Sequence, residues 1–423
     1  MKPFSEKENR RNLELYLHIP FCVRKCSYCD FLSMPAEETL RRQYVDMLLT
    51  ELREKGRFCR GYQVSTVFFG GGTPSLLSGV QIAELMEEVR NSFSLEPEAE
   101  ITLECNPGTL DRQKLLFCRN SGINRLSMGL QSASNRELEL LGRIHTFEEF
   151  LENFALARKM GFENINLDLI SGLPRQTVED WRDTLEKVLA LRPDHISAYS
   201  LMVEEGTLFF EQYGADELRR EQGEHPEILP EEETEREMYE LTRNLLEEKG
   251  YHRYEISNYA RTGRECRHNT GYWQRVPYLG LGLGSASLME EKRFSNPRDL
   301  ETYLKGQYVD LSRILQKGPE NPGRESGNGP GEQQNLPAEV TVLDKTQQME
   351  EFMFLGLRMT EGISRAEFRR QFGMEPEGIY GARLQKFQSQ GLVEQKEGRI
   401  FLTEAGIGVS NYVLSGFLVE QDG

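Results

Sequence analysis

The first half of the chain alternates short apolar runs with stretches in which apolar residues recur at helical spacing. After the first run, for example, Leu40, Tyr44, Leu48 and Leu52 share one face of a helix. Strand–helix alternation is typical of βαβ units around a parallel sheet. The apolar runs predict six strands, at 13–19, 64–69, 101–105, 123–128, 165–170 and 195–201. Six units are fewer than the eight of a closed barrel, so we predict an α/β fold built on a partial (β/α)6 barrel.

The second half is less regular. After residue 205 it is acidic, with a helical stretch near 231–249 and a glycine-rich, strand-like run near 278–288. Residues 317–337 are rich in Gly, Pro, Asn and Glu and almost free of apolar residues, which predicts a flexible insertion. The chain then turns helical and ends with two strand-like runs around a Lys-Glu-Gly turn, as in a winged-helix module. We therefore expect a barrel at 1–205, a barrel extension at 206–310, a flexible insertion at 311–346 and a C-terminal α+β, winged-helix-like domain at 347–423.

Charge and cysteine content limit the classes of protein. The 423-residue chain has a net charge of −17. This argues against nucleic acid as a partner, because faces that bind phosphate backbones are basic. No apolar stretch has the length of a signal peptide or of a membrane span. Seven cysteines, an odd number, without an export signal indicate a reducing compartment. We therefore expect a cytoplasmic protein in which clustered thiols bind metal.

Three of the cysteines, Cys22, Cys26 and Cys29, follow the first predicted strand with CxxxCxxC spacing. A four-iron cluster usually takes four thiolates, so three of them leave one iron with an open position. This arrangement is used when S-adenosylmethionine chelates the open iron through its amino and carboxylate groups and is cleaved reductively. Zinc sites normally add a second Cys or His pair, which we do not find at suitable spacing. Ordinary buried thiols are the other alternative.

Glycines and polar residues lie where the later predicted strands end. Gly70, Gly71 and Gly72 follow the second strand, where they allow a tight turn or the close approach of a ligand to the backbone. Glu104 ends the third strand, Gln131 follows the fourth, Arg143 lies at the helix after it, and Asp168 lies within the fifth. Glu104 alone also fits a solvated strand end, whereas an Asp buried inside an apolar strand, such as Asp168, is costly unless it finds partners. Because the carboxyl ends of parallel strands meet at one edge of a sheet, we expect these residues to lie around the cysteine triplet.

The motifs CVRKCSYCDF, GGGTPS, NRLSMGLQS, LDLISGLP and HISAYSL together resemble the oxygen-independent coproporphyrinogen oxidase superfamily of radical S-adenosylmethionine proteins. The resemblance covers nearly the whole chain apart from the insertion. It implies that Cys22, Cys26 and Cys29 hold a [4Fe-4S] cluster in a radical S-adenosylmethionine barrel. It also implies contacts to S-adenosylmethionine from Tyr16, Tyr28, Gly71, Gly72, Thr73, Glu104, Gln131, Arg143 and Asp168, with Tyr28 acting through its backbone.

Two groups within this superfamily differ at places that can be compared here. The oxidases carry a fourth cysteine two residues after the triplet, where this chain has Phe31. The HemW-type heme chaperones carry CxF at that place and an HNxxYW motif, which this chain has at 268–273. The resemblance therefore favours a chaperone that transfers heme and depends on the cluster and S-adenosylmethionine. An oxygen-independent coproporphyrinogen III oxidase is the alternative, and a metal-free regulator that binds DNA through its C-terminal domain is a third class.

His268 opens the HNxxYW motif, and the resemblance makes it the expected heme-binding residue. Imidazole is a standard axial ligand of heme iron, and the neighbouring Tyr272 and Trp273 suit a flat macrocycle. On residue chemistry alone, a histidine beside aromatic residues also fits a core position with a satisfied hydrogen bond. The resemblance further implies a heme-accepting protein, an electron donor such as flavodoxin or ferredoxin, and a homodimer that depends on the cluster. Membrane association is expected only through the acceptor.

Overall fold

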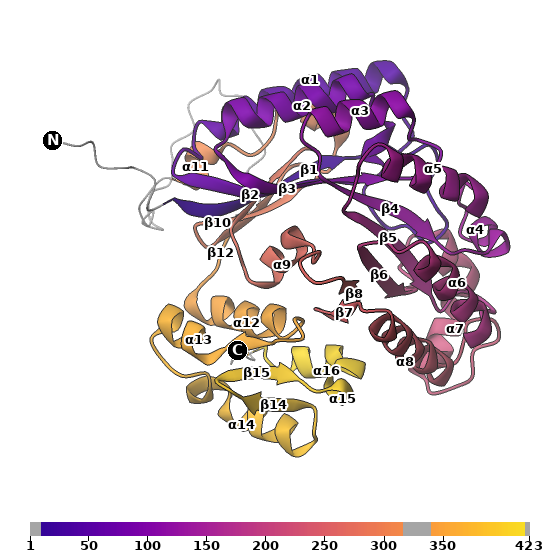
Figure 1. The fold of residues 1–423 in the computed structure, drawn as a ribbon. Helices are drawn as coiled ribbons and strands as arrows, with labels where there is room; N and C mark the ends of the chain where they lie inside the picture. The colour runs from indigo at the N-terminus through magenta and orange to yellow at the C-terminus, as the bar shows by residue number, and fades with distance from the viewer. Residues whose placement is uncertain (1–9, 316–339, 419–423) are drawn as a thin grey trace.

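The computed structural model describes residues 10–315 and 340–418, so the predicted insertion at 317–337 lies outside the described residues. Within the described part, six parallel strands form the centre of a twelve-stranded sheet that curves into a partial barrel (Figure 1). These strands are β1 (Arg11–Ile19), β2 (Tyr62–Gly71), β3 (Leu95–Cys105), β4 (Arg125–Gln131), β5 (Ile165–Ser171) and β6 (His195–Ser200). They are neighbours in sequence order. The predicted partial barrel of six parallel strands is confirmed.

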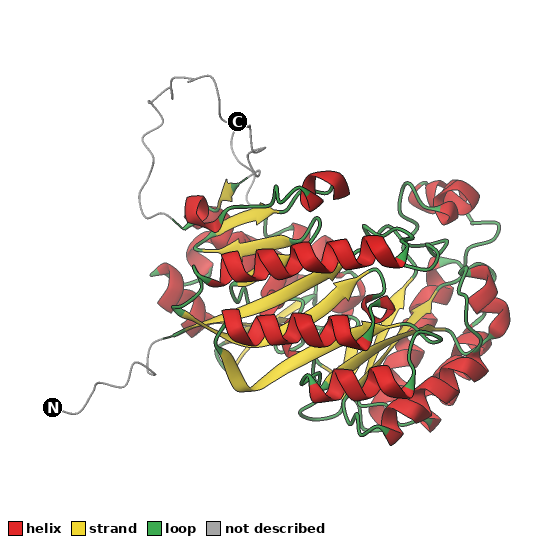
Figure 2. Cartoon of the chain, turned by 90° about the horizontal axis from the view of Figure 1, so that it is seen from above, coloured by secondary structure: helices red, strands yellow, loops and turns green. Residues whose placement is uncertain are grey.

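Helices cover the outer face of these strands, as Figure 2 shows from above. This layer contains α1 (Glu38–Gly56), α2 (Gly79–Ser92), α3 (Arg112–Asn120), α5 (Phe147–Lys159) and α6 (Val178–Ala190). Local sequence sets the start of three of them, because Ser78, Thr146 and Thr177 form capping boxes at α2, α5 and α6. The short elements η1 (Pro74–Leu76) and α4 (Asn135–Leu140) lie in loops at the carboxyl ends of strands.

Alternation along the strands separates an apolar outer face from a polar inner face. On β1, Leu13, Leu15 and Leu17 are fully buried in the main core. The residues between them, Glu14, Tyr16 and His18, point the other way, since successive side chains of a strand lie on opposite faces. Equivalent inner positions on β2 to β6 include Thr66, Glu100, Glu104, Arg125, Ser127, Asn166, Asp168 and His195. The inner face therefore carries the polar chemistry of the barrel.

Short strands extend the sheet at both edges. β9 (Tyr278–Leu281) pairs in parallel with β1 and is followed by the antiparallel strands β10 (Ala286–Met289), β11 (Lys292–Ser295) and β12 (Thr341–Val342). At the other edge, β8 (Asn258–Ala260) pairs with β6, and β7 (His252–Arg253) pairs with β8. The remaining helices of this half are α7 (Leu208–Glu221), α8 (Glu232–Glu248), α9 (Arg267–Trp273), α10 (Leu300–Leu304) and α11 (Leu311–Ile314). None of the helices in the described residues is long and apolar enough to cross a bilayer.

The C-terminal unit has its own core and sheet, shown in orange and yellow in Figure 1. It consists of α12 (Lys345–Gly356), β13 (Ile363–Ser364), α13 (Arg365–Phe372), α14 (Glu377–Ser389), β14 (Val393–Lys396), β15 (Arg399–Leu402), α15 (Glu404–Gly408) and α16 (Ser410–Ser415). The three strands pair antiparallel in the order β13-β15-β14. Glu397 and Gly398 both have positive φ, 53° and 77°, as a two-residue hairpin turn requires. The predicted C-terminal α+β unit is confirmed.

Candidate iron–sulfur and cofactor site

The three cysteines lie in the loop between β1 and α1, residues 20–37, which we call the Cys loop. Backbone hydrogen bonds fix its base, from Cys22 N to Met34 O at 3.0 Å, and its tip, from Ser27 N to Leu141 O at 3.0 Å. All three thiols are free and partly exposed. The loop therefore presents three thiols from a well-anchored backbone at the carboxyl end of the sheet.

The number of thiols in the Cys loop fits a four-iron cluster with one open iron, because each thiolate would bind a different iron atom and leave the fourth for another ligand. A structural zinc ion takes four protein ligands. Within the described residues, no group of three or more His, Cys, Asp and Glu side chains is placed to hold a single metal ion.

Polar groups from neighbouring loops contact two of the thiols. Thr73 Oγ1 lies 3.4 Å from Cys22 Sγ, and Arg143 Nη1 donates to Cys26 Sγ at 3.6 Å. Asn106 connects them: its Nδ2 donates to Thr73 Oγ1 at 2.8 Å and its Oδ1 accepts from Arg143 Nη2 at 2.6 Å. Cys26, Thr73, Asn106 and Arg143 line one small cleft. Sequence reasoning missed Asn106, although its place directly after the third strand was a usable signal.

The end of β2 packs Gly71 against His18 on β1, and the next residue, Gly72, against Phe21 at the base of the Cys loop. Gly71 has φ +113° and donates its N–H to Glu104 Oε2 at 3.2 Å. Gly72 donates its N–H to Ile19 O at 2.9 Å, and a Cβ at Gly72 would lie 2.7 Å from Phe21 O. The close approach of two segments explains both glycines. Their N–H groups are already used within the protein.

Two carboxyl groups, Glu104 on β3 and Asp168 on β5, face the inner side of the sheet near its carboxyl end. Burial, and then the charge of Asp168, raise the pKa of Glu104 to about 8, so this group is mostly protonated at neutral pH. Asp168 accepts hydrogen bonds from Ser127 Oγ at 3.1 Å and from Asn166 Nδ2 at 2.8 Å, while burial raises its pKa. A positively charged ligand with hydroxyl groups would relieve the electrostatic cost of this pair.

Gln131 and Arg143 meet at the end of β4. Gln131 is buried and has φ +74°, which is uncommon for a residue other than glycine and is often found at functional sites. Arg143 Nη2 donates to Gly129 O at 2.7 Å, and a Cβ at Gly129 would lie 3.0 Å from Gln131 Nε2. Arg143 Nε is buried and has no hydrogen-bond partner among the described residues. The end of β4 thus carries an amide and a partly unpaired guanidinium beside the cleft.

His18, which sequence reasoning missed, links Tyr16 to the Cys loop. The Tyr16 hydroxyl lies 3.1 Å from His18 Nδ1, and His18 Nε2 lies 2.9 Å from Leu32 O. The alternation of β1 was the available signal, since Tyr16 and His18 share its inner face. Tyr28 lies in the Cys loop, and its ring packs against Phe209 with the centroids 6.4 Å apart.

Comparisons with known proteins give the family. The chain matches the family model of the Radical SAM superfamily over residues 16–188 and that of the HemN C-terminal domain over residues 343–409. It is 35% identical over 411 residues to the heme chaperone HemW of Bacillus subtilis (strain 168), covering 96% of this chain and 99% of that one. The chain belongs to the HemW family. The heme chaperone HemW of Escherichia coli (strain K12) is 33% identical over 417 residues, covering 96% and 98%.

The likeness of this chain to a coproporphyrinogen oxidase is a likeness of fold alone. The solved structure of coproporphyrinogen III oxidase (HemN) from Escherichia coli matches with a TM-score of 0.78, covering 98% of this chain and 92% of that one. Its sequence identity is 23%, below that of the HemW relatives, so this likeness shows a shared fold. At the place where the oxidases carry a fourth cysteine, Phe31 is 61% exposed at the surface of the Cys loop.

His268 is buried on the inner face of the barrel. Helix α9 packs against β2 beneath the sheet (Figure 1), and only 2% of His268 is exposed. Its Nδ1 lies 2.6 Å from Thr66 Oγ1 and its Nε2 lies 3.1 Å from Tyr272 Oη. Burial, and then the charge of Arg125, lower its pKa to about 3, so the ring is neutral. His268 thus has the environment of a core residue with satisfied hydrogen bonds.

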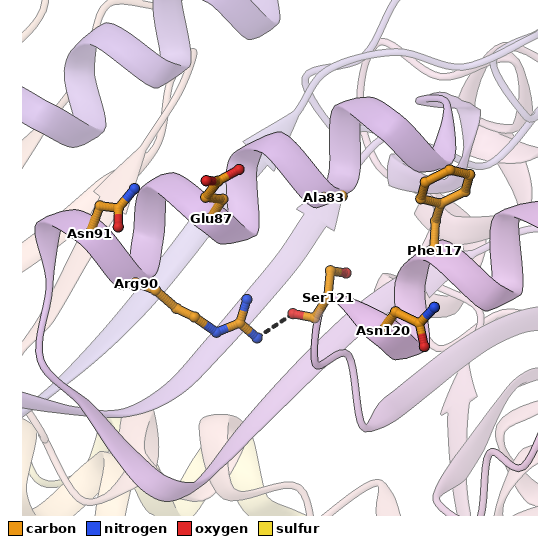
Figure 3. Close-up of a pocket in the computed structure, with 7 residues that line it drawn as sticks. All are labelled: Ala83, Glu87, Arg90, Asn91, Phe117, Asn120 and Ser121. Carbon is orange, nitrogen blue, oxygen red and sulfur yellow. Dashed lines mark hydrogen bonds between the residues drawn. The ribbon is translucent and has the colours of Figure 1, made fainter.

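A groove between α2 and α3 lies apart from these residues (Figure 3). It is lined by Ala83, Glu87, Arg90, Asn91, Phe117, Asn120 and Ser121. Arg90 donates a hydrogen bond to Ser121 O across it. Arg90, Asn91 and Asn120 belong to the carboxyl ends of the two helices, which lie at the amino ends of the strands in a βα unit. The groove is therefore at the end of the barrel opposite the Cys loop.

Proposed function

We propose that this protein is a heme chaperone that passes heme, its cargo, to an acceptor protein, and that its Cys loop binds a [4Fe-4S] cluster with S-adenosylmethionine at the open iron. One observation carries the proposal. A single loop presents three free, partly exposed thiols, in a chain that aligns over 96% of its length with HemW proteins of two bacteria. When bound and reduced, a cluster of this kind would supply the electron for reductive cleavage of a carbon–sulfur bond of S-adenosylmethionine.

The surrounding residues suit the parts of that cofactor. The Arg143 guanidinium donates to Cys26 Sγ and has an Nε–H without a hydrogen-bond partner among the described residues, so it can also pair with a carboxylate. Protonated Glu104 can both donate to and accept from a hydroxyl group, and Asp168 accepts. The S-adenosylmethionine contacts that we propose are Tyr16, Tyr28, Gly71, Gly72, Thr73, Glu104, Gln131, Arg143 and Asp168.

Exposed apolar side chains lie in the Cys loop and in the loops that follow β4 and β6. Val23, Phe31, Ile144 and Met202 are 55%, 61%, 53% and 68% exposed. Val23 and Ile144 line the same cleft as Cys26. Exposed apolar surface beside a polar site is typical of interaction surfaces. These four exposed side chains support contact with a flat apolar cargo and with an acceptor protein at the cluster end of the barrel.

Anaerobic reconstitution followed by heme transfer tests the proposal. We expect about four iron and four sulfide per chain. Protein loaded with hemin should transfer it to apomyoglobin, used as a generic acceptor, and Cys26→Ser should abolish cluster assembly and slow transfer. Cys59→Ala, which removes a buried thiol outside the Cys loop, is the control and should keep both.

Two outcomes would contradict this assignment. Zinc in place of iron, or the absence of inorganic sulfide, would remove the cluster. Robust conversion of coproporphyrinogen III to protoporphyrinogen by the reconstituted protein would identify an oxidase instead of a chaperone.

A further inference from the structure

Helix α9 is held tightly against the inner face of the barrel. The backbone N–H groups of Arg267 and His268 donate to the two oxygens of Glu100 on β3, at 3.2 and 3.3 Å. Gly271 lies so close to Glu14 on β1 that an added Cβ would collide with that carboxyl group. Burial, and then the charge of Glu100, raise the pKa of Glu14 to about 9, so Glu14 is protonated and does not repel Glu100. The helix therefore has one well-defined position on β1 and β3.

One end of α9 contacts the proposed cofactor site. The ring of His268 lies nearly parallel to those of Phe68 and Tyr16, with centroids 5.0 and 6.4 Å apart. Tyr16 is hydrogen-bonded to His18, and His18 to the backbone of Leu32 in the Cys loop. A continuous series of packed rings and hydrogen bonds thus connects α9 to the loop that carries the three thiols.

The other end of α9 contacts the C-terminal unit. The Arg358 guanidinium lies 4.4 Å from the centroid of the Trp273 ring, a cation–π distance. Trp273 also packs against a cluster that contains Tyr254 and Met359. Arg358 and Met359 follow α12, the first helix of the C-terminal unit. Trp273 therefore lies at the junction between the barrel and this unit.

From these contacts we propose that α9 couples occupancy of the S-adenosylmethionine site to the position of the C-terminal unit, and that His268 is a positioning residue on this path and not the heme ligand. The inference rests on the proposed function, because it takes Tyr16 and the Cys loop as the cofactor site. Coupling between two sites is reciprocal. If a cofactor beside Tyr16 favours the arrangement in which Trp273 contacts Arg358, then loss of that contact weakens cofactor binding.

Arg358→Ala in the full-length, reconstituted protein tests the coupling. We expect the Kd for S-adenosylmethionine to rise by about two- to thirtyfold, the range for mutations along coupled paths, with iron and sulfide unchanged. Arg370→Ala is the matched control, because Arg370 is an exposed arginine of the same unit that pairs with its helix neighbour Glu367. In the unmodified protein, S-adenosylmethionine should slow hydrogen exchange at residues 353–360. Equal affinities in the two variants, or unchanged exchange, would overturn the coupling.

Two substitutions at His268 separate positioning from iron ligation. His268→Gln keeps a polar group near Tyr272, whereas His268→Leu removes it. We expect both variants to show the hemin Soret band of the unmodified protein. We also expect the leucine variant to bind S-adenosylmethionine more weakly and the glutamine variant to recover part of the loss. A Soret band lost in both variants would assign His268 to the iron and overturn this role. Failure of the proposed function is a different outcome, namely unmodified protein without inorganic sulfide.

Discussion

At the scale of single residues, the packing of the His18 ring on β1 against the end of β2 leaves no space for a side chain at Gly71. Its φ is +113°, and an added Cβ would lie 2.5 Å from the His18 ring. We expect Gly71→Ala to lower the free energy of unfolding by about 1–3 kcal/mol, the cost of a strained backbone. Urea unfolding measures this loss. Gly61→Ala is the control, because nothing lies within 4 Å of its added Cβ, and an equal loss in both variants would contradict the steric argument.

Glu104 gives the protein a pH-dependent stability whose sign follows from burial. Its pKa rises from 4.5 to about 8 on folding, so between these values the folded protein binds more protons at this group than the unfolded chain does. The contribution of Glu104 to the free energy of unfolding is therefore fully present at low pH and is lost as the pH rises through this window. Relative to the Glu104→Gln variant, the unmodified protein should lose at most about 1.4 kcal/mol of unfolding free energy for each unit by which the pH rises. Urea unfolding at about pH 5, 6.5 and 8 checks this, and parallel pH profiles would contradict it.

Sequence patterns identified those residues near the cysteines that follow the carboxyl ends of parallel strands, because such ends lie at one edge of the sheet. Thr73 and Arg143 follow different strands, and the structure brings both into contact with the thiols because the carboxyl ends of parallel strands converge. His18 and Asn106 escaped the sequence reasoning, since each acts through partners on other segments. For His268, residue chemistry already allowed the core position that the structure shows, but local sequence did not give the face of the sheet on which α9 packs.

At the scale of elements, a buried ion pair within α1 supplies hydrogen bonds that hold this helix against the β9 edge of the sheet, one of them from Lys55 Nζ to Gly280 O on β9 at 3.4 Å. Lys55 Nζ lies 2.6 Å from Glu51 Oε1, with both side chains at most 2% exposed, and it donates to Asn296 Oδ1 at 3.2 Å. Lys55→Met leaves the Glu51 charge uncompensated, and we expect a loss of about 3–5 kcal/mol in unfolding free energy. Arg53→Met removes a more exposed pair with Glu88 and should cost less than about 1 kcal/mol. Similar losses in urea unfolding would show that burial does not govern this pair.

Elements were predictable where local signals agree with the tertiary fold. Strands β1 to β6 carry apolar runs, and the β14–β15 hairpin has Glu397 and Gly398 at its turn, where both residues take positive φ. The two-residue strands β7, β12 and β13 left no readable pattern, because two residues cannot display a period. They form where a neighbouring strand edge offers hydrogen-bond partners.

At the scale of the whole molecule, charged contacts tie the C-terminal unit to the barrel. Glu351 on α12 accepts hydrogen bonds from Arg275 Nε at 3.0 Å and from Arg293 Nε at 2.9 Å. Glu404 on α15 accepts from two arginines near the opposite edge of the sheet. Together with the Trp273 contact, these interactions join segments that are distant in the sequence. Composition and motif spacing therefore predicted the C-terminal unit as an element of the fold but not its attachment.

Glu351→Gln tests whether these charges hold the junction. The side chain of Arg275 is 4% exposed, so loss of the Glu351 charge leaves a buried guanidinium less well compensated. Hydrogen bonds to charged groups contribute about 1.5–3 kcal/mol, and we expect a loss of this size together with faster hydrogen exchange in α12. Glu367→Gln, which alters an exposed pair within one helix, should cost about 0.5 kcal/mol or less and leave exchange in α12 unchanged. If both variants exchange alike, apolar packing around Trp273 holds the unit in place, and the α9 contact becomes its main connection to the cofactor site.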